Sequence, residues 1–263
     1  MPWLLNLVET FDANEKEVGK ISKNRFNNEF TLIPISHTTQ TAHIEVVVTE
    51  NGDFHAAHVV EKENAITVIP TTIDSASRSG KAVYPYPLHD KLMYTAGDFD
   101  EYSNKSTERK NFEAYINLLK EWVHSPYKHN TIEAIYKYVN KGRLIQDLIE
   151  ANILFIDKNN KLIEKWNKSY EKIYGERPEI FSVVSETQES AFVRFSVHSS
   201  EKIIDKPWRD HTLFQSFIDF YNEKIKESEK TDVCYVTGKL LPSTEKHANK
   251  IRNSGDKAKL ISA

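Results

Sequence analysis

The chain has 263 residues and a formal net charge of −3, and 39% of its residues are hydrophobic and 11% aromatic. This composition is typical of a globular chain and excludes a wholly disordered one, since disordered chains are poor in aromatic residues. A single cysteine, Cys234, excludes an intramolecular disulfide framework, and no apolar run approaches the roughly 20 residues that span a bilayer, so we expect a cytoplasmic protein without membrane association.

A short helix is predicted at the start of the chain. Leu4, Leu7, Val8 and Phe11 recur at helical spacing, which favours an amphipathic helix over residues 2–12.

A block of strands is predicted to follow this helix. β-branched and aromatic residues favour strands over residues 30–35, 43–49, 54–60 and 65–70. Asn-Gly at 51–52 separates the second strand from the third and is typical of a tight hairpin turn. The apolar run 46–48 indicates a strand that is covered on both faces.

The pattern changes after the strands. Serine, glycine and proline crowd residues 72–87, which predicts a loop. Apolar stripes at helical spacing then predict helices between 107 and 174, and we expect these stripes to pack in the core. A strand over 192–197, a helix over 208–226 and a short strand over 233–236 complete the prediction.

The fold class predicted from this order is α+β. An N-terminal mixed or antiparallel sheet with a hairpin occupies 1–100, a helical insertion occupies 101–180, and short strands with a helix and a basic C-terminal segment return over 181–263. The last 31 residues hold six basic residues against two acidic ones, so the cationic end of this acidic chain is its C-terminus.

Common enzyme signatures are absent from the sequence. It has no phosphate loop, no GxGxxG, no GxSxG, no HExxH and no paired CxxC. His55 and His58 fall on a predicted strand at a spacing that places them on opposite faces, and His124 and His129 flank a Ser-Pro turn. We therefore expect neither a metal site nor a cofactor.

One cysteine-based alternative remains open. A nucleophilic thiol at Cys234 with His247 as its base would make a hydrolase. However, Cys234 lies in the apolar pattern Val-Cys-Tyr-Val, which favours a buried structural role.

Two segments are suited to polyanions. A loop of hydroxyls, cations and a glycine is predicted to contact DNA; it consists of Ser77, Arg78, Ser79, Gly80 and Lys81. The C-terminal segment carries spaced cations with an amide between them, and could follow a phosphate backbone. The residues predicted to do so are Lys246, Asn249, Lys250, Arg252 and Lys257.

Four stretches of the sequence form an ordered set of motifs. The first is Pro34–Glu45. The second is Arg78-Ser79-Gly80 followed by Leu88-x-Asp90-x-x-x-Tyr94-x-x-Gly97. The third is Ala191–Val197 with Trp208 shortly after it. The fourth is Cys234–Gly238 followed by His247, Lys250-Ile251 and Gly255. In this order, the four stretches resemble the Csd-type large subunits of type I-C CRISPR complexes.

The resemblance implies a role in target recognition. In such a complex the guide RNA reads the target by pairing, while the large subunit reads the short protospacer-adjacent motif on double-stranded DNA and helps to open the duplex. The implied partners are target DNA, guide-RNA-bound backbone subunits and a recruited helicase-nuclease that performs the cleavage. No catalytic residue is then expected in this chain, which would be a truncated form of relatives that continue for several hundred residues. A protein-interaction module that does not touch DNA is the remaining alternative.

Overall fold

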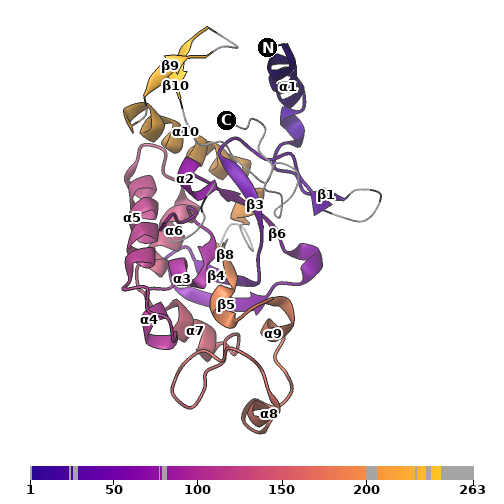
Figure 1. Cartoon of the computed structure of the whole chain (residues 1–263), viewed down its shortest axis with the longest axis vertical. Coiled ribbons are helices and arrows are strands. Elements are labelled where there is room, and N and C mark those ends of the chain that lie inside the picture. Colours follow the sequence, from indigo (N-terminus) through magenta and orange to yellow (C-terminus); the bar gives the residue numbers. More distant parts are fainter. Residues whose placement is uncertain are drawn as a thin grey trace.

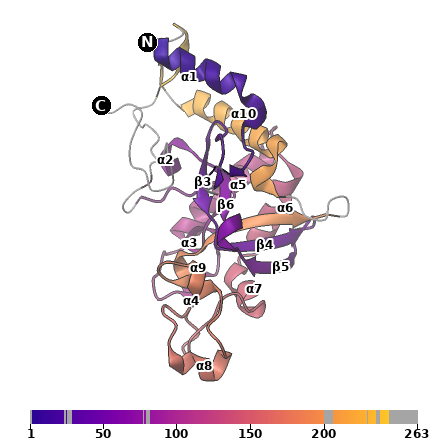
Figure 2. The same cartoon turned by 90° about the vertical axis from the view of Figure 1, so that its right-hand side faces the viewer.

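The computed structural model describes residues 2–23, 25, 29–76, 78, 82–199, 206–228, 230–234 and 238–243. Within these ranges, helix α1 (Pro2–Ala13) lies towards one end of the long axis of the molecule and α8 (Lys168–Tyr174) at the other, with the main sheet between them (Figure 1 and Figure 2). The α+β class expected from the sequence is confirmed.

A four-stranded mixed sheet forms the centre of the fold, in the order β5-β4-β8-β7. Strands β4 (Ile44–Thr49) and β5 (Phe54–Val59) pair as the predicted antiparallel hairpin. Strand β8 (Phe192–His198) runs parallel to β4, and β7 (Asp90–Lys91) pairs antiparallel with β8. A strand from the last third of the chain therefore lies between two strands that belong to its first 91 residues.

Helices cover one face of this sheet. Side chains that alternate along the two central strands, such as Val46 on β4 and Phe195 on β8, enter the main hydrophobic core. Tyr138 of α6 (Asn130–Val139) packs there, with its ring centroid 6.4 Å from that of Phe195. Helix α5 (Lys110–His124) lies beside α6, and Trp122 of α5 donates to Ser216 Oγ of α10 (His211–Ser228) over 3.0 Å.

A pair of antiparallel strands covers the opposite face. This pair consists of β3 (His37–Thr41) and β6 (Ile66–Pro70). A second apolar cluster lies between the two layers and contains Phe192 of β8 and Ile69 of β6. Both faces of β4 are thus covered, as its apolar run predicted.

The remaining elements are short. They are η1 (Glu15–Glu17), β1 (Ser22–Lys23), β2 (Glu29–Phe30), η2 (Lys62–Asn64), α2 (Ile73–Ala76), α3 (Leu92–Thr95), α4 (Phe99–Tyr102), α7 (Leu144–Glu150), α9 (Ile180–Val183), η3 (Gln188–Ser190), η4 (Pro207–Arg209), β9 (Thr231–Val233) and β10 (Leu240–Pro242). In the part of the chain that is described, no helix combines the length and the apolar character needed to cross a bilayer.

Several expected boundaries were wrong. The strand expected over 30–35 is replaced by β2, which ends at Phe30, and by β3, which begins at His37. Pro34 lacks an N–H for a strand ladder and Ser36 has φ +56°, so the chain turns between the two strands. The expected loop over 72–87 contains α2, and the strand expected over 233–236 ends at Val233 as β9, with 235–237 outside the described residues.

The hairpin turn requires glycine at position 52. Its φ is +79°, and a Cβ added at this position would lie 2.5 Å from the Cβ of Lys137 on α6. The turn is therefore pressed against the helix that covers the sheet, and only glycine meets both the dihedral and the steric requirement.

Candidate nucleic-acid interface

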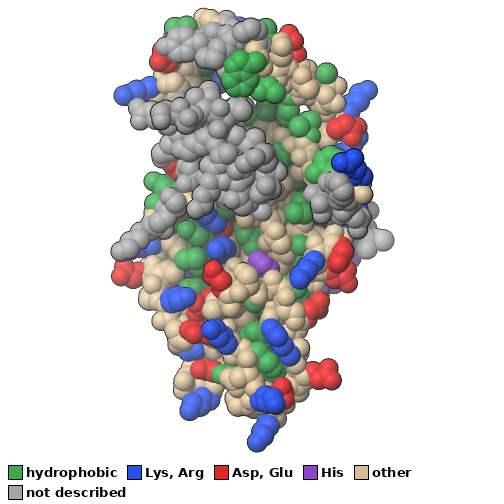
Figure 3. Space-filling model, turned by 45° about the vertical axis from the view of Figure 1, so that its right-hand side comes forward, with side chains coloured by type: hydrophobic (Ala, Val, Ile, Leu, Met, Phe, Trp, Pro, Cys, Tyr) green, Lys and Arg blue, Asp and Glu red, His purple; other side chains and the backbone are tan. Residues whose placement is uncertain are grey.

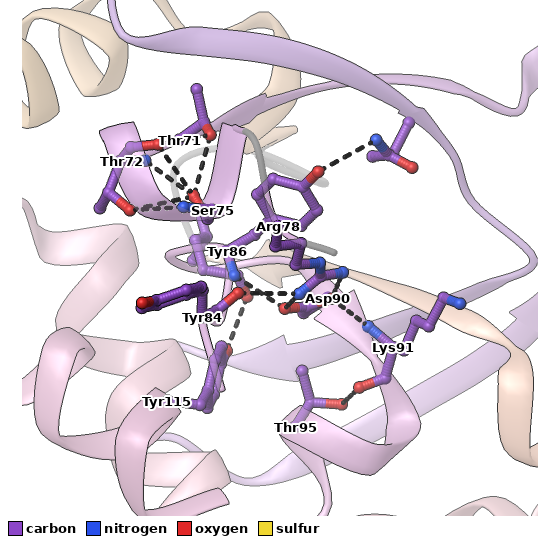
Figure 4. Close-up of polar contacts among 12 residues, drawn as sticks. Thr71, Thr72, Ser75, Arg78, Tyr84, Tyr86, Asp90, Lys91, Thr95 and Tyr115 are labelled. Atoms are coloured by element: carbon purple, nitrogen blue, oxygen red, sulfur yellow. Dashed lines mark hydrogen bonds and ion pairs between the residues drawn. The ribbon is translucent and has the colours of Figure 1, made fainter. Parts of the chain in front are cut away.

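Arg78 is the one residue of the predicted DNA-contacting loop that the structure describes, and it forms a bidentate ion pair with Asp90 (Figure 4). Arg78 Nη1 donates to Asp90 Oδ2 and Nη2 donates to Oδ1, each over 2.7 Å. The same carboxylate accepts from the backbone N–H groups of Tyr86 (2.7 Å) and Lys91 (2.8 Å). Asp90 is fully buried and the Arg78 side chain is 16% exposed, so this pair is largely removed from water.

Two tyrosine rings enclose the guanidinium. Arg78 Cζ lies 4.1 Å from the ring centroid of Tyr86 and 4.8 Å from that of Tyr94. Burial raises the pKa of Asp90, and the hydrogen bonds and charge of Arg78 oppose that rise. Burial alone would lower the pKa of Arg78, but Asp90 raises it above its ordinary value. Arg78 thus favours the charged form of Asp90 against the effect of burial, and Asp90 favours the charged form of Arg78.

The segments on either side of this loop are also held in place. On the N-terminal side, Ser75 Oγ accepts from the N–H of Thr72 over 2.8 Å and lies 2.9 Å from Thr71 Oγ1. On the C-terminal side, Leu88 has φ +74°, and its carbonyl accepts from the Tyr115 hydroxyl over 2.7 Å. A leucine in this backbone conformation is strained and persists only where surrounding contacts enforce it. The loop is thus anchored at both ends, while Ser77, Ser79, Gly80 and Lys81 lie outside the described residues.

A second buried ion pair joins the two central strands. Glu45 of β4 stands opposite Arg194 of β8, and Arg194 donates to Glu45 Oε2 from Nε (2.9 Å) and Nη2 (2.6 Å). Ser196 Oγ donates to Glu45 Oε1 over 2.9 Å. The guanidinium lies 4.0 Å from the ring centroid of Trp208, which is itself buried.

The electrostatics of this second pair favour its charged form. Burial alone would raise the pKa of Glu45, but the hydrogen bonds of His58, Arg194 and Ser196 and the charge of Arg194 outweigh burial and lower the pKa to about 2. His58 Nε2 lies 3.5 Å from Glu45 Oε2. Sequence reasoning assigned no role to this pair. A signal was present, because one glutamate and one arginine each interrupt an otherwise apolar strand.

Two histidines are buried elsewhere in the core. His37 and His89 each have an Nε2 atom without a hydrogen-bond partner, and burial lowers their pKa values to about 4 and about 3. They are therefore neutral in the folded state at neutral pH. Across the described ranges, no group of three His, Cys, Asp or Glu side chains is arranged to hold a metal ion.

The cysteine of the hydrolase alternative is half-buried. Cys234 follows β9 instead of lying inside a strand, and its N–H donates to the Lys239 carbonyl over 2.8 Å. The expected full burial within a strand was therefore wrong. Its proposed partner His247 lies outside the described residues, as do Lys246, Asn249, Lys250, Arg252 and Lys257 of the basic segment.

A comparison with protein families identifies the group to which the chain belongs. A family model described as CRISPR-associated protein (Cas_Csd1) matches residues 7–263. The chain belongs to this family. The resemblance seen in the sequence is thereby confirmed, and no curated protein matches the chain. Within this Csd1-family chain, Arg78 contacts Asp90 and Tyr94 of the same resembling stretch. Glu45 of the first stretch contacts Arg194 of the third.

Proposed function

We propose that the chain acts in the large subunit of a type I-C CRISPR surveillance complex, and that it reads the protospacer-adjacent motif on double-stranded DNA and helps to open the duplex. Membership of the CRISPR-associated Csd1 family, over nearly the whole chain, supports a place in such a complex. Guide-RNA-bound backbone subunits would hold the chain, and a recruited helicase-nuclease would cut the target, so the chain itself needs no catalytic residue.

The anchored loop is the observation that carries the motif-reading proposal. A short loop that inserts into a DNA groove loses less conformational entropy if the protein already holds both of its ends. The Arg78–Asp90 pair and the strained Leu88 provide that restraint. In the proposal, Ser77, Ser79, Gly80 and Lys81 contact the DNA, where a narrow minor groove exposes base-edge acceptors and attracts cations.

Arg78 has a different part in this proposal from the DNA contact predicted from the sequence. Its two terminal nitrogens both donate to Asp90, and its guanidinium lies against the Tyr86 ring. A guanidinium held in this way positions the loop, because leaving Asp90 for a phosphate would strand a buried carboxylate. Direct contact between Arg78 and DNA stays a prediction.

The basic C-terminal segment is proposed to contact phosphates without reading sequence. Lys246, Lys250, Arg252 and Lys257, together with Asn249, would neutralise backbone charge on an otherwise acidic chain. A triple variant, K246A/K250A/K257A, should reduce affinity evenly across sequences and reduce the slope of log K against log salt by about 2 to 3. An unchanged slope would contradict this assignment.

Assembly is the first experiment. The chain is co-expressed with guide-RNA-bound backbone subunits, and the purified complex is footprinted on target DNA with and without the adjacent motif. The proposal predicts co-purification and protection of the duplex beside the guide-matched region. Co-purification without any protection attributable to this chain would favour the protein-interaction alternative.

A further inference from the structure

A cavity of about 350 Å³ opens beside the buried Glu45–Arg194 pair. It lies between β5, the connection from β5 to β6, and η4. Its volume falls at the lower end of the range for pockets that hold small ligands or parts of larger ones. The functional proposal above makes no use of this cavity.

The inner wall of the cavity is rigid. The side chains of Glu45 and Arg194 are 4% and 5% exposed, and Arg194 Nη1 also donates to the Asn64 carbonyl (2.7 Å) and to Thr67 Oγ1 (3.3 Å). Trp208 closes the wall with its ring 4.0 Å from the guanidinium carbon. These contacts hold the cationic group without a need for ligand, so the wall is formed in advance.

The rim of the cavity carries exposed basic side chains. Lys206 and Arg209 flank Pro207 and Trp208, and both are exposed. His58 is 54% exposed and contributes a third nitrogen-bearing side chain from β5. Three permanent cations, Arg194 included, line the cavity against two carboxylates, Glu45 and Glu61.

The two carboxylates do not make this a cation site. Both Glu45 oxygens already accept hydrogen bonds, from Arg194 and Ser196, and its charge is neutralised by the guanidinium. Glu61 lies at the exposed edge, where Asn64 Nδ2 donates to it over 3.4 Å. The electrostatic potential at the opening of the cavity is therefore determined mainly by Lys206 and Arg209.

Charges elsewhere on the described surface are mixed. On the face shown in Figure 3, Lys and Arg side chains are interspersed with Asp and Glu around the end of the molecule that holds α8. A local cluster of basic side chains around a preformed cavity is thus a better site for an anion than a surface on which positive and negative side chains alternate.

We propose that this cavity binds a phosphate group of a nucleic-acid strand, with Lys206 and Arg209 donating to its oxygens. Lysine and arginine at an exposed rim are the side chains that most often hold backbone phosphates, and such contacts position a strand without reading its sequence. The choice of nucleic acid as the ligand rests on the proposed function. The phosphate chemistry rests on the cavity alone.

The test uses the 263-residue chain and a fluorescein-labelled 20-nucleotide single strand in 50 mM salt, with affinity read by anisotropy. The variant K206A/R209A should bind at least about tenfold more weakly than the parent, and its slope of log K against log salt should be flatter by about 1 to 2. The matched control K120A/K128A removes the same charge from exposed positions on and after α5, and should stay within about twofold of the parent. All four side chains are exposed, so the melting temperatures should agree.

Three results would overturn the proposal. One is equal weakening in both variants, and another is no measurable strand binding by the parent. A third is a variant that loses affinity for inorganic phosphate in calorimetry yet binds the strand as the parent does, since the cavity would then hold a small phosphorylated ligand. None of these measurements uses an adjacent motif. Failure of motif reading in the assembled complex would therefore be a separate result.

Discussion

Replacing Arg78 with alanine tests whether this residue anchors the chain at the proposed DNA-reading segment. The change removes both hydrogen bonds to Asp90 and leaves a carboxylate with no exposed surface facing only two backbone N–H donors. Breaking a buried ion pair by removal of one partner costs about 3–5 kcal/mol. The lost contacts with two tyrosine rings add about 0.5–2 kcal/mol, while protonation of Asp90 offsets part of the loss. We expect a net loss of about 3 kcal/mol in the free energy of unfolding.

Urea unfolding followed by circular dichroism measures this loss. The control is K141A, which breaks an ion pair with Asp53 whose side chains are 40% and 64% exposed, and which should cost less than about 1 kcal/mol. The cost of R78A should also shrink as pH falls, because Asp90 without its partner becomes neutral by taking up a proton. An R78A variant within about 1 kcal/mol of the parent at pH 7 would refute the anchoring role.

Three further outcomes are expected. His37 and His89 have pKa values of about 4 and about 3 in the folded chain, against 6.5 in the unfolded chain. The folded chain therefore loses stability as pH falls below 6.5, by about 2 kcal/mol for each histidine at pH 5. A urea midpoint that does not move between pH 7 and pH 5 would contradict this. G52A should destabilise the chain by at least about 1 kcal/mol more than G175A. Both glycines have positive φ, but of the two only Gly52 has atoms within 4 Å of an added Cβ. Equal unfolding midpoints of the two variants would show that contact with α6 is unimportant. At pH 7 the Cys234 thiol should react with a disulfide reagent no faster than the thiol of glutathione, whereas a rate at least about tenfold faster would support the hydrolase with His247.

Local signals in the sequence predicted those parts of the fold that local contacts determine. The hairpin between β4 and β5 follows from Asn-Gly between two strand-forming runs, and the helical stripes follow from spacing that a core-facing helix requires. The apolar run in β4 correctly indicated a strand with two covered faces.

These local signals do not predict which strands pair when the strands lie far apart in the sequence. Glu45 and Arg194 meet because β4 and β8 are parallel neighbours, yet 149 positions separate them in the chain. No periodicity in either strand specifies which other strand it will pair with, so the buried pair and the cavity beside it became visible only in the structure. The same holds for Arg78, because the composition of its segment suggested solvent or DNA as its partner, whereas the structure pairs it with Asp90.

The central claim is that the anchored loop reads the adjacent motif, and the ratio of two affinities tests it most directly. The assembled complex containing K81A is compared with the parent and with the K120A control on two duplexes that share the guide-matched sequence and differ only in the adjacent motif. The account predicts that K81A lowers the preference for the correct motif by about tenfold, as the loss of one good groove contact does, while K120A leaves the preference unchanged. A K81A complex that retains the full preference would contradict the account.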